Sequence, residues 1–383
     1  MKVINKISSL LLMSAVMFSS CNNKAGGDDV NLNDVLYISS DKNVIQSNDT
    51  DAAVFTAVIN EKDVTAETVF YLVEGEQMTP LAGNMLKVGK AGVYSVKASY
   101  KTFITTEAVT VNAINMEVPA PVEESAADAA KTSFVHRAFL NQYTGTGCGY
   151  CPGMIRALRK AFEDPETAEM AVLAAVHSFG AGDPAYIGSP RSQSYPYLHI
   201  DMVQGFTYDM DPYAEMGVLK NALKERTASP AKVGIAANPI YKDGVLVVTV
   251  SVKAANDGEY NLGVWFLQDN VYGQQTDNIG IVGSDKSYSY HDNCVRAADS
   301  RYLGMYTGHP MGKVAAGQTV SRTFVLNVNE TDWKLKDLND LHFAAFVTET
   351  VVTETGKGKK VKSYPVVNVV DCKYNEPTPY DYK

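Results

Sequence analysis

Hydrophobic residues follow two different periods along the chain, and the change of period divides it into three blocks. From about residue 32 to residue 115, apolar residues alternate with polar ones or form short β-branched runs separated by turn residues. This is the pattern of β-strands. Five strands are predicted, namely Val35 to Ile38, Ala53 to Ile59, Thr68 to Val73, Gly92 to Ala98 and Val109 to Ala113. Their spacing favours an immunoglobulin-like β-sandwich.

The second block, residues 133 to 230, carries both periods. An apolar and aromatic run from Phe134 to Tyr143 predicts a buried strand, and helical spacing follows from Met154 to Phe162. Ala171 to Val176 predicts a second buried strand, and Glu215 to Arg226 predicts a second helix. Strand, helix, strand, insertion and helix in this order indicate a thioredoxin-like α/β domain, whose site lies at the carboxyl ends of the strands.

The third block, residues 231 to 383, returns to the strand pattern and predicts a C-terminal β-sandwich. Its clearest strands are Val245 to Val252, Leu262 to Leu267, His342 to Thr348 and Val361 to Val370. Between Tyr272 and Met311 lies a long, tyrosine-rich segment without a regular period. We expect it to pack over the thioredoxin-like domain, with ligand binding as the alternative. The predicted fold class is therefore α+β with several domains.

The first 20 residues have the anatomy of a secretory signal peptide, with two lysines, an apolar run from Ile7 to Phe18 and two serines before Cys21. A cysteine after two small residues resembles a bacterial lipobox, in which Cys21 would carry the lipid. Ordinary cleavage with a free Cys21 is the alternative. Residues 21 to 31 are predicted to form a flexible tether. Residues 116 to 132, which contain two prolines and several charges, are predicted to form a mobile or partly helical linker.

The net charge of the chain limits the classes of partner that it is expected to bind. The chain has 383 residues and a formal net charge of −9, and removal of a signal peptide with Lys2 and Lys6 makes it more negative. Such an acidic surface argues against nucleic acid as a partner. We predict no cofactor and no metal. The expected partners are exported proteins with thiols or disulfides, or an envelope or host protein.

The strongest chemical signal is the run Cys148-Gly149-Tyr150-Cys151-Pro152 between the first predicted strand and helix of the second block. A helix N-terminus stabilises a thiolate, and proline suits the first helical turn. We predict that Cys148 attacks and that Cys151 resolves the mixed disulfide. Gly149, Tyr150 and Pro152 would support this site.

His177 follows the next predicted strand and is a candidate to approach Cys148 and tune its thiolate. A hydrogen-bonded structural histidine is the alternative.

Two non-catalytic roles for Cys148 and Cys151 are also compatible with the sequence. A static disulfide would staple the turn, and a zinc site would need further ligands, which are distant in the sequence. For the two remaining cysteines, Cys294 and Cys372, we predict a second, structural disulfide, because the chain is exported. Two buried free thiols are the alternative.

Several of these features together resemble the outer membrane protein 28-related lipoproteins of Bacteroidetes. The parts that carry the resemblance are the lipobox, the N-terminal sandwich, Tyr143-Thr144-Gly145 before the cysteine motif, His177, Leu262 to Gln268, and the loop from Tyr290 to Arg296. The resemblance covers most of the mature chain. It implies a thioredoxin-like domain followed by a β-sandwich, anchored to the outer membrane on its periplasmic or cell-surface face.

Three positions depart from thioredoxin-like relatives. Those proteins usually place a cis-proline opposite the cysteine pair in a Gly-aromatic-Pro turn, whereas here Gly205-Phe206 is followed by Thr207. Gly147 stands where many relatives carry tryptophan, and Asn141 stands where the family often has an acidic residue. We therefore expect the substrate-aligning proline to be missing and the cysteine pair to react slowly.

Two functions from different classes follow. The first is a lipid-anchored thiol–disulfide oxidoreductase that acts on exported proteins through Cys148 and Cys151. The second is a non-enzymatic surface lipoprotein that binds a partner through its β-sandwiches, with the cysteine pair as a structural disulfide.

Overall fold

Strands make up most of the regular structure in the part of the chain that the computed structural model describes. This part comprises residues 34–188, 191–207, 212–298, 308–331, 333–356 and 359–383. The predicted signal peptide, the lipidation of Cys21 and the tether lie outside the described residues. None of the helices within these ranges is long and apolar enough to cross a membrane.

The N-terminal block is a sandwich of two sheets. One sheet contains β1 (Leu36–Ser40), β3 (Ala53–Ile59), β4 (Lys62–Asp63) and β7 (Met85–Leu86). The other contains β2 (Val44–Gln46), β10 (Val109–Ile114), β8 (Gly92–Tyr100), β5 (Val69–Glu74), β6 (Gln77–Pro80) and β9 (Phe103–Ile104). Every second residue of β3 is buried, as the alternating pattern predicts. The Phe55 and Phe70 rings, one from each sheet, lie 5.9 Å apart in the core.

The second and third blocks share one nine-stranded sheet. Its order is β14-β13-β11-β12-β20-β17-β23-β26, with β21 also paired to β17. The strands from the second block are β11 (Ala138–Thr144), β12 (Ala171–His177), β13 (Tyr197–Ile200) and β14 (Gln204–Thr207). Those from the third block are β17 (Gly258–Gln268), β20 (Cys294–Ala298), β21 (His309–Val314), β23 (Leu341–Glu349) and β26 (Val366–Lys373).

The two halves of this sheet meet at β12 and β20. The strands run parallel and pair at Ala175 and Cys294, and the Ala175 N–H donates to the carbonyl of Asn293 at 2.8 Å. The predicted boundary at residue 230 therefore marks a change of element along the chain but not a break in the sheet.

A second layer completes the C-terminal sandwich. It contains β15 (Val233–Lys242), β16 (Val245–Ala254) and β22 (Thr319–Asn327), and it packs on β17, β23 and β26 through a shared apolar core. The short pairs are β18 (Val271–Tyr272) with β19 (Tyr290–His291), and β24 (Val351–Glu354) with β25 (Lys360–Ser363). The strand predicted over Val361 to Val370 is thus two strands, β25 and β26, and the break between them contains Pro365, which has no N–H to donate.

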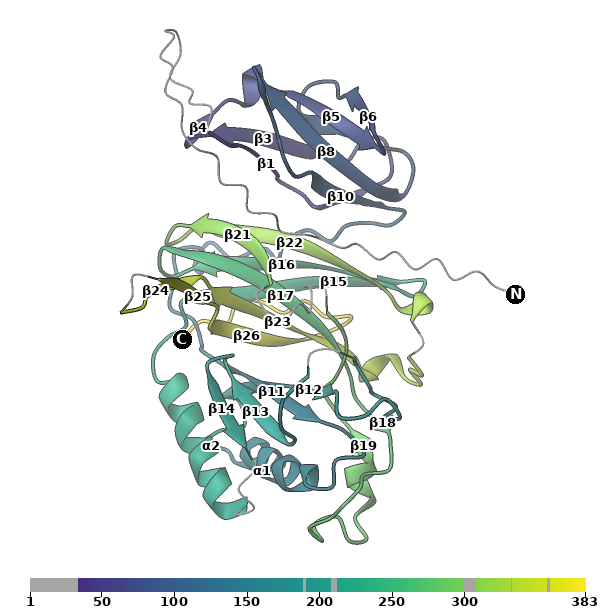
Figure 1. The fold of residues 1–383 in the computed structure, drawn as a ribbon, viewed down its shortest axis with the longest axis vertical. Helices are drawn as coiled ribbons and strands as arrows, with labels where there is room; N and C mark the ends of the chain where they lie inside the picture. The colour runs from purple at the N-terminus through teal and green to yellow at the C-terminus, as the bar shows by residue number, and fades with distance from the viewer. Residues whose placement is uncertain (1–33, 189–190, 208–211, 299–307, 332, 357–358) are drawn as a thin grey trace, which may run out of the picture.

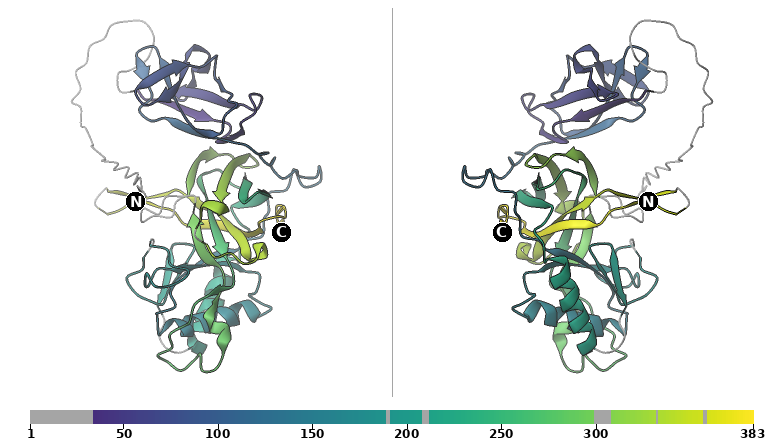
Figure 2. Two further views of the ribbon diagram at one scale, coloured as in Figure 1. Left: turned by 90° about the vertical axis from the view of Figure 1, so that its right-hand side faces the viewer. Right: turned by 90° about the vertical axis from the view of Figure 1, so that its left-hand side faces the viewer.

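Two α-helices cover one face of the β11 to β14 region. They are α1 (Cys151–Glu163) and α2 (Pro212–Arg226). Leu140 and Leu198 of the sheet pack there with Leu158 of α1 and Leu223 of α2. The 3-10 helices are η1 (Thr65–Glu67), η2 (Lys286–Ser289), η3 (Val328–Glu330) and η4 (Leu338–Asp340). In Figures 1 and 2 the helices lie at one end of the molecule, the N-terminal sandwich lies at the other, and the C-terminal sandwich lies between them.

Successive side chains of β11 point to opposite faces of the sheet and therefore lie in two different environments. Leu140 faces the helices, whereas Phe139 lies on the opposite face, with its ring 5.2 Å from Trp265 and 4.9 Å from Phe346. By the same alternation Asn141 faces away from α1, and Gln142 and Thr144 face toward it.

The linker between the first two blocks contacts the C-terminal sandwich. The ammonium group of Lys253 on β16 is buried and donates to the carboxylate of Glu124 at 2.8 Å and to the carbonyl of Ala129 at 2.7 Å. These bonds satisfy a buried charge, which would otherwise be costly. They fasten the linker to the C-terminal sandwich.

Candidate functional site

Cys148 and Cys151 form a disulfide at the start of α1. The sulfur atoms are 2.07 Å apart, and the Cα atoms are 5.4 Å apart. Cys151 is the first residue of the helix, and Pro152 lies in its first turn, as the sequence predicts. The Cys148 N–H donates to the carbonyl of Gly145 at 3.0 Å, which closes the turn that leads from β11 into the helix.

A segment from the third block lies over this turn. The N–H groups of Thr276 and Asn278 donate to the carbonyls of Thr146 and Gly149 at 2.8 and 2.9 Å. We call residues 273–278 the covering segment. The expected packing of the tyrosine-rich region over the second block is thereby confirmed for this part of it.

The disulfide is almost inaccessible to solvent. Cys148 is 2% exposed and Cys151 is 0% exposed, whereas Tyr150 between them is 46% exposed. Thiol exchange requires a collision between an incoming thiolate and a sulfur atom. The disulfide can therefore exchange only when its surroundings, including the covering segment, move.

Glycine allows the covering segment to approach so closely. A Cβ atom at Gly149 would overlap the side-chain amide of Asn278. At Gly273, a Cβ would lie 2.7 Å from the methyl group of Thr146. Gly149 thus supports the site by making room, and the sequence motif alone gave no sign of this.

His177, at the end of β12, belongs to a buried cluster beside the cysteine turn. Its Nδ1 lies 2.8 Å from the Asp183 carboxylate, and its Nε2 lies 3.6 Å from the Cys294 sulfur. The ring is also in edge contact with His291, at 4.9 Å between centroids. Both nitrogens of His177 therefore have partners other than Cys148, and a tuning role at Cys148 stays a prediction.

Asp183 connects His177 to the cysteine turn. One of its oxygens accepts hydrogen bonds from His177 and from the Thr146 N–H at 2.6 Å, and the other accepts from the Ala185 N–H at 2.9 Å. Burial alone would raise the pKa of Asp183, but these hydrogen bonds and the charge of His177 outweigh it and lower the pKa to about 2. Asp183 is consequently ionised at neutral pH.

The other two members of the cluster are held in their neutral forms. Burial lowers the pKa of His291 to about 4, and the neighbouring His177 acts in the same direction. The Nε2 of His291 lies 3.0 Å from the carbonyl of Gly273, where the covering segment begins. Burial also raises the pKa of Cys294 well above its usual range. Cys294 is therefore a protonated thiol, unsuited to act as a nucleophile in this environment.

The predicted disulfide between Cys294 and Cys372 is wrong, because both residues are free and buried. Cys294 lies opposite Gln268 of β17, and Cys372 lies opposite Phe343 of β23. Two strands thus separate the cysteines, which at about 4.8 Å per strand places them roughly 14 Å apart, too far for a disulfide. The alternative of two buried free thiols is confirmed.

The proline that we expected to be missing after Gly205-Phe206 is absent there, but the structure contains a cis-proline at another position. The peptide bond between Tyr195 and Pro196 is cis, directly before β13. Tyr197 pairs with Tyr143 of β11, so Pro196 lies beside the end of β11 that leads to the cysteines. Thr207, the position expected for this proline, ends β14 and pairs with Tyr197 instead. The sequence analysis missed this position, because it predicted no strand after Pro196.

The described residues therefore define a β-rich, multidomain protein with a buried disulfide in a Cys-x-x-Cys turn. No protein-family model matches the chain, and no curated protein matches it. Among solved structures, it is similar to HBP35 of Porphyromonas gingivalis, with 17% identity and a TM-score of 0.47, over 63% of this chain and 76% of that one. It is also similar to a domain of the outer membrane lipoprotein Omp28 from the same organism, with 19% identity and a TM-score of 0.23, over 38% of this chain and 89% of that one.

Proposed function

We propose that this chain is an exported lipoprotein whose Cys148 and Cys151 form a thioredoxin-like centre for thiol–disulfide exchange with exported proteins. The observation that carries this proposal is the position of the two cysteines relative to the sheet. They follow the strand β11, which is flanked by the parallel β12 and the antiparallel β13. The helix α1 begins at Cys151, and the cis-proline Pro196 adjoins the same end of β11. The succession of β11, α1 and β12 supports this proposal.

The chemistry at such a centre is an exchange of bonds between sulfurs. A substrate thiolate attacks the sulfur of Cys148, the Cys148–Cys151 bond breaks, and the electron pair remains on Cys151 as a thiolate. A second substrate thiolate then attacks the substrate sulfur in the mixed disulfide and releases Cys148. The substrate gains a disulfide, and the centre gains two electrons. The N-terminus of α1 stabilises the thiolates that form beside it.

Glutathione equilibration of the folded protein tests this proposal. We expect a reversible distribution between the disulfide and the dithiol, read by mass after alkylation. The Cys294→Ser variant should show the same distribution, which would assign it to Cys148 and Cys151. A disulfide that stays closed under a strong dithiol reductant, while circular dichroism shows the native fold, would contradict the proposal.

The burial of both sulfurs favours a second candidate function. In this case the disulfide is a staple, and the chain is a surface lipoprotein that binds an envelope or host partner through its sandwiches. The Cys148→Ser/Cys151→Ser double variant should then unfold at a lower temperature, and the native disulfide should resist dithiothreitol. Ready opening of the disulfide without unfolding would exclude this function.

The proposed location is the outer membrane, with the lipid on Cys21. It is supported by the N-terminal sequence, in which an apolar run and two serines precede this cysteine. Metabolic labelling with a radioactive fatty acid tests the anchor, since Cys21→Ser should abolish labelling. Trypsin treatment of intact cells distinguishes the periplasmic face from the cell-surface face of the outer membrane, because only protein on the cell surface should be cleaved.

A further inference from the structure

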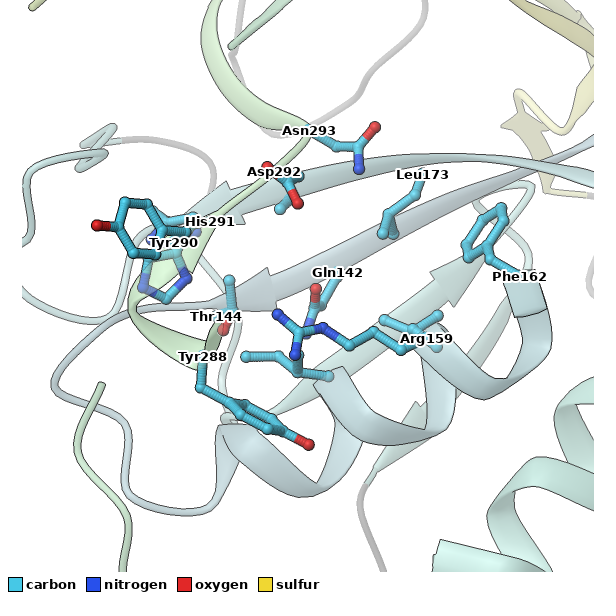
Figure 3. Close-up of a pocket in the computed structure, with 14 residues that line it drawn as sticks. Gln142, Thr144, Arg159, Phe162, Leu173, Tyr288, Tyr290, His291, Asp292 and Asn293 are labelled. Carbon is cyan, nitrogen blue, oxygen red and sulfur yellow. The ribbon is translucent and has the colours of Figure 1, made fainter. Parts of the chain in front are cut away.

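A cavity of about 210 Å³ lies between α1 and the strands β11 and β12 (Figure 3). The loop around β19 closes its third side. The cavity does not include Cys148 or Cys151 among its lining residues. It is thus a separate feature, and its interpretation does not depend on thiol chemistry.

Two buried polar atoms in its wall have no hydrogen-bond partner among the residues that the structure describes. These are Nε2 of Gln142, on a side chain that is 3% exposed, and Oγ1 of Thr144, on a residue that is 1% exposed. Both side chains come from β11 and face α1. Buried polar groups are nearly always hydrogen-bonded, because an unpaired one destabilises the fold. Two unpaired groups in the wall of one cavity therefore point to a ligand that accepts hydrogen bonds.

Arg159 adds a positive charge to the same cavity. Its guanidinium lies 4.5 Å from the centroid of the Tyr288 ring and donates to the hydroxyl of Ser287 at 2.9 Å. In Figure 3 this side chain extends from α1 toward the strands that carry Gln142 and Thr144. The guanidinium retains further N–H groups, because it has five donors. A carboxylate is a natural acceptor for this combination of donors.

The Asp292 carboxyl group also lines the cavity; burial raises its pKa, and one of its oxygens accepts a hydrogen bond from the Asn270 N–H at 3.0 Å. The opposite end of the cavity is apolar, with Phe162 of α1 near Leu173 of β12 (Figure 3). A volume of about 210 Å³ gives room for a small molecule with a short apolar tail.

We propose that this cavity binds a small carboxylate with a short apolar tail. The carboxylate accepts hydrogen bonds from Gln142 Nε2 and Thr144 Oγ1 and lies near the Arg159 guanidinium. The tail lies against Phe162 and Leu173. Short fatty acids and apolar amino acids share this chemistry.

Isothermal titration with hexanoate tests the proposal. We expect saturable binding, and at least tenfold weaker binding of hexylamine and of hexan-1-ol, which lack the carboxylate. A parallel titration with L-leucine distinguishes an apolar amino acid from a short fatty acid as the ligand. Binding of either carboxylate supports the site, and failure of both to bind overturns it.

Substitutions in the cavity wall then test whether hexanoate binds at this position. Gln142→Leu and the isosteric Thr144→Val should each weaken hexanoate binding at least tenfold, with the thermal unfolding temperature maintained, because each removes an unpaired buried atom. Gln268→Leu is the matched control, since Gln268 is similarly buried and its Oε1 has no partner among the described residues, but it does not line the cavity. If Gln142→Leu does not fold, Thr144→Val alone carries the test. Equal binding by Thr144→Val and the parent protein would overturn the proposal.

Discussion

The side-chain amide of Gln275 donates a hydrogen bond of 2.9 Å to the carbonyl oxygen of Cys148. These residues are 127 positions apart in the sequence, one in the cysteine turn and the other in the covering segment. The same amide lies 3.3 Å from the Thr146 carbonyl and 3.0 Å from that of Thr276. One buried side chain thus joins the two segments of backbone beside the disulfide.

Replacement of Gln275 by alanine should expose the disulfide. The Thr146 and Cys148 carbonyls keep their backbone donors, so the variant loses only the side-chain link, which costs about 0.5–1.5 kcal/mol per hydrogen bond in the free energy of unfolding. We expect dithiothreitol to reduce Cys148–Cys151 several times faster in the variant, as measured by timed alkylation and mass. Gln274→Ala, at the exposed neighbouring position, is the control. Equal rates in all three proteins would show that this contact does not limit access.

A methyl group at Gly149 should also loosen the covering segment. Gly149→Ala places a Cβ on the side-chain amide of Asn278, and overpacking of this kind costs about 1–3 kcal/mol. Asn278→Ala should restore part of the lost stability when combined with it, because it removes the overlapping group. Urea unfolding of the two single variants and the double variant measures this coupling. Strict additivity of the two effects would contradict the proposed contact.

The stability of the protein should fall as the pH drops from about 6.5 to about 4, because of His291. Burial lowers the pKa of this residue from 6.5 to about 4, so the unfolded chain takes up its proton before the folded one. The loss is on the order of 3 kcal/mol at the lower end of this range. His291→Gln, which does not titrate, should lack this phase in urea unfolding measured as a function of pH.

Asp183 should produce a second loss of stability at lower pH. Its pKa lies at about 2 in the folded protein instead of 3.8, so its contribution is present above about pH 4 and is lost as the pH falls toward 2. The contribution is on the order of 2 kcal/mol. Asp183→Asn should be less stable at neutral pH and should show no further loss from this group in acid. An unchanged acid profile would show that the carboxylate does not stabilise the fold.

Cys294 and Cys372 should be unreactive in the native protein and reactive after unfolding. Both thiols are buried, and burial raises the pKa of Cys372 to about 12. A maleimide should label neither residue in the folded protein at pH 7 and both in guanidinium chloride without reductant. Peptide mapping identifies the labelled positions. Labelling of Cys294 in the native state would show that the cluster around His177 opens.

The sequence predicts those helices and strands whose apolar residues have a clear period and whose buried face packs against one core. The strand β12 and the helix α1 are examples, because their burial follows directly from the spacing of apolar residues. The covering segment could not be predicted in detail, because its contacts join residues that are more than 120 positions apart. Pro196 was missed because its cis peptide lies in an aromatic insertion with no regular period.

The error at Cys294 and Cys372 has a different cause. An even number of cysteines in an exported chain suggests a disulfide, but a buried free thiol is equally compatible with such a sequence. Only the strand order, which places β17 and β23 between the two cysteines, decides the matter. Likewise, alternation places Asn141 on the face of β11 away from α1, so the polar residues that matter next to the helix are Gln142 and Thr144.

The single pairing between Ala175 and Cys294 means that the cysteine-bearing half of the molecule has no complete edge of its own. If residues 133–230 were expressed alone, β12 would expose unpaired backbone groups and the apolar face that otherwise packs against Trp265 and Phe346. An open strand of this kind recruits other chains, and self-association is the usual result. The two blocks that share this sheet should therefore fold as one unit.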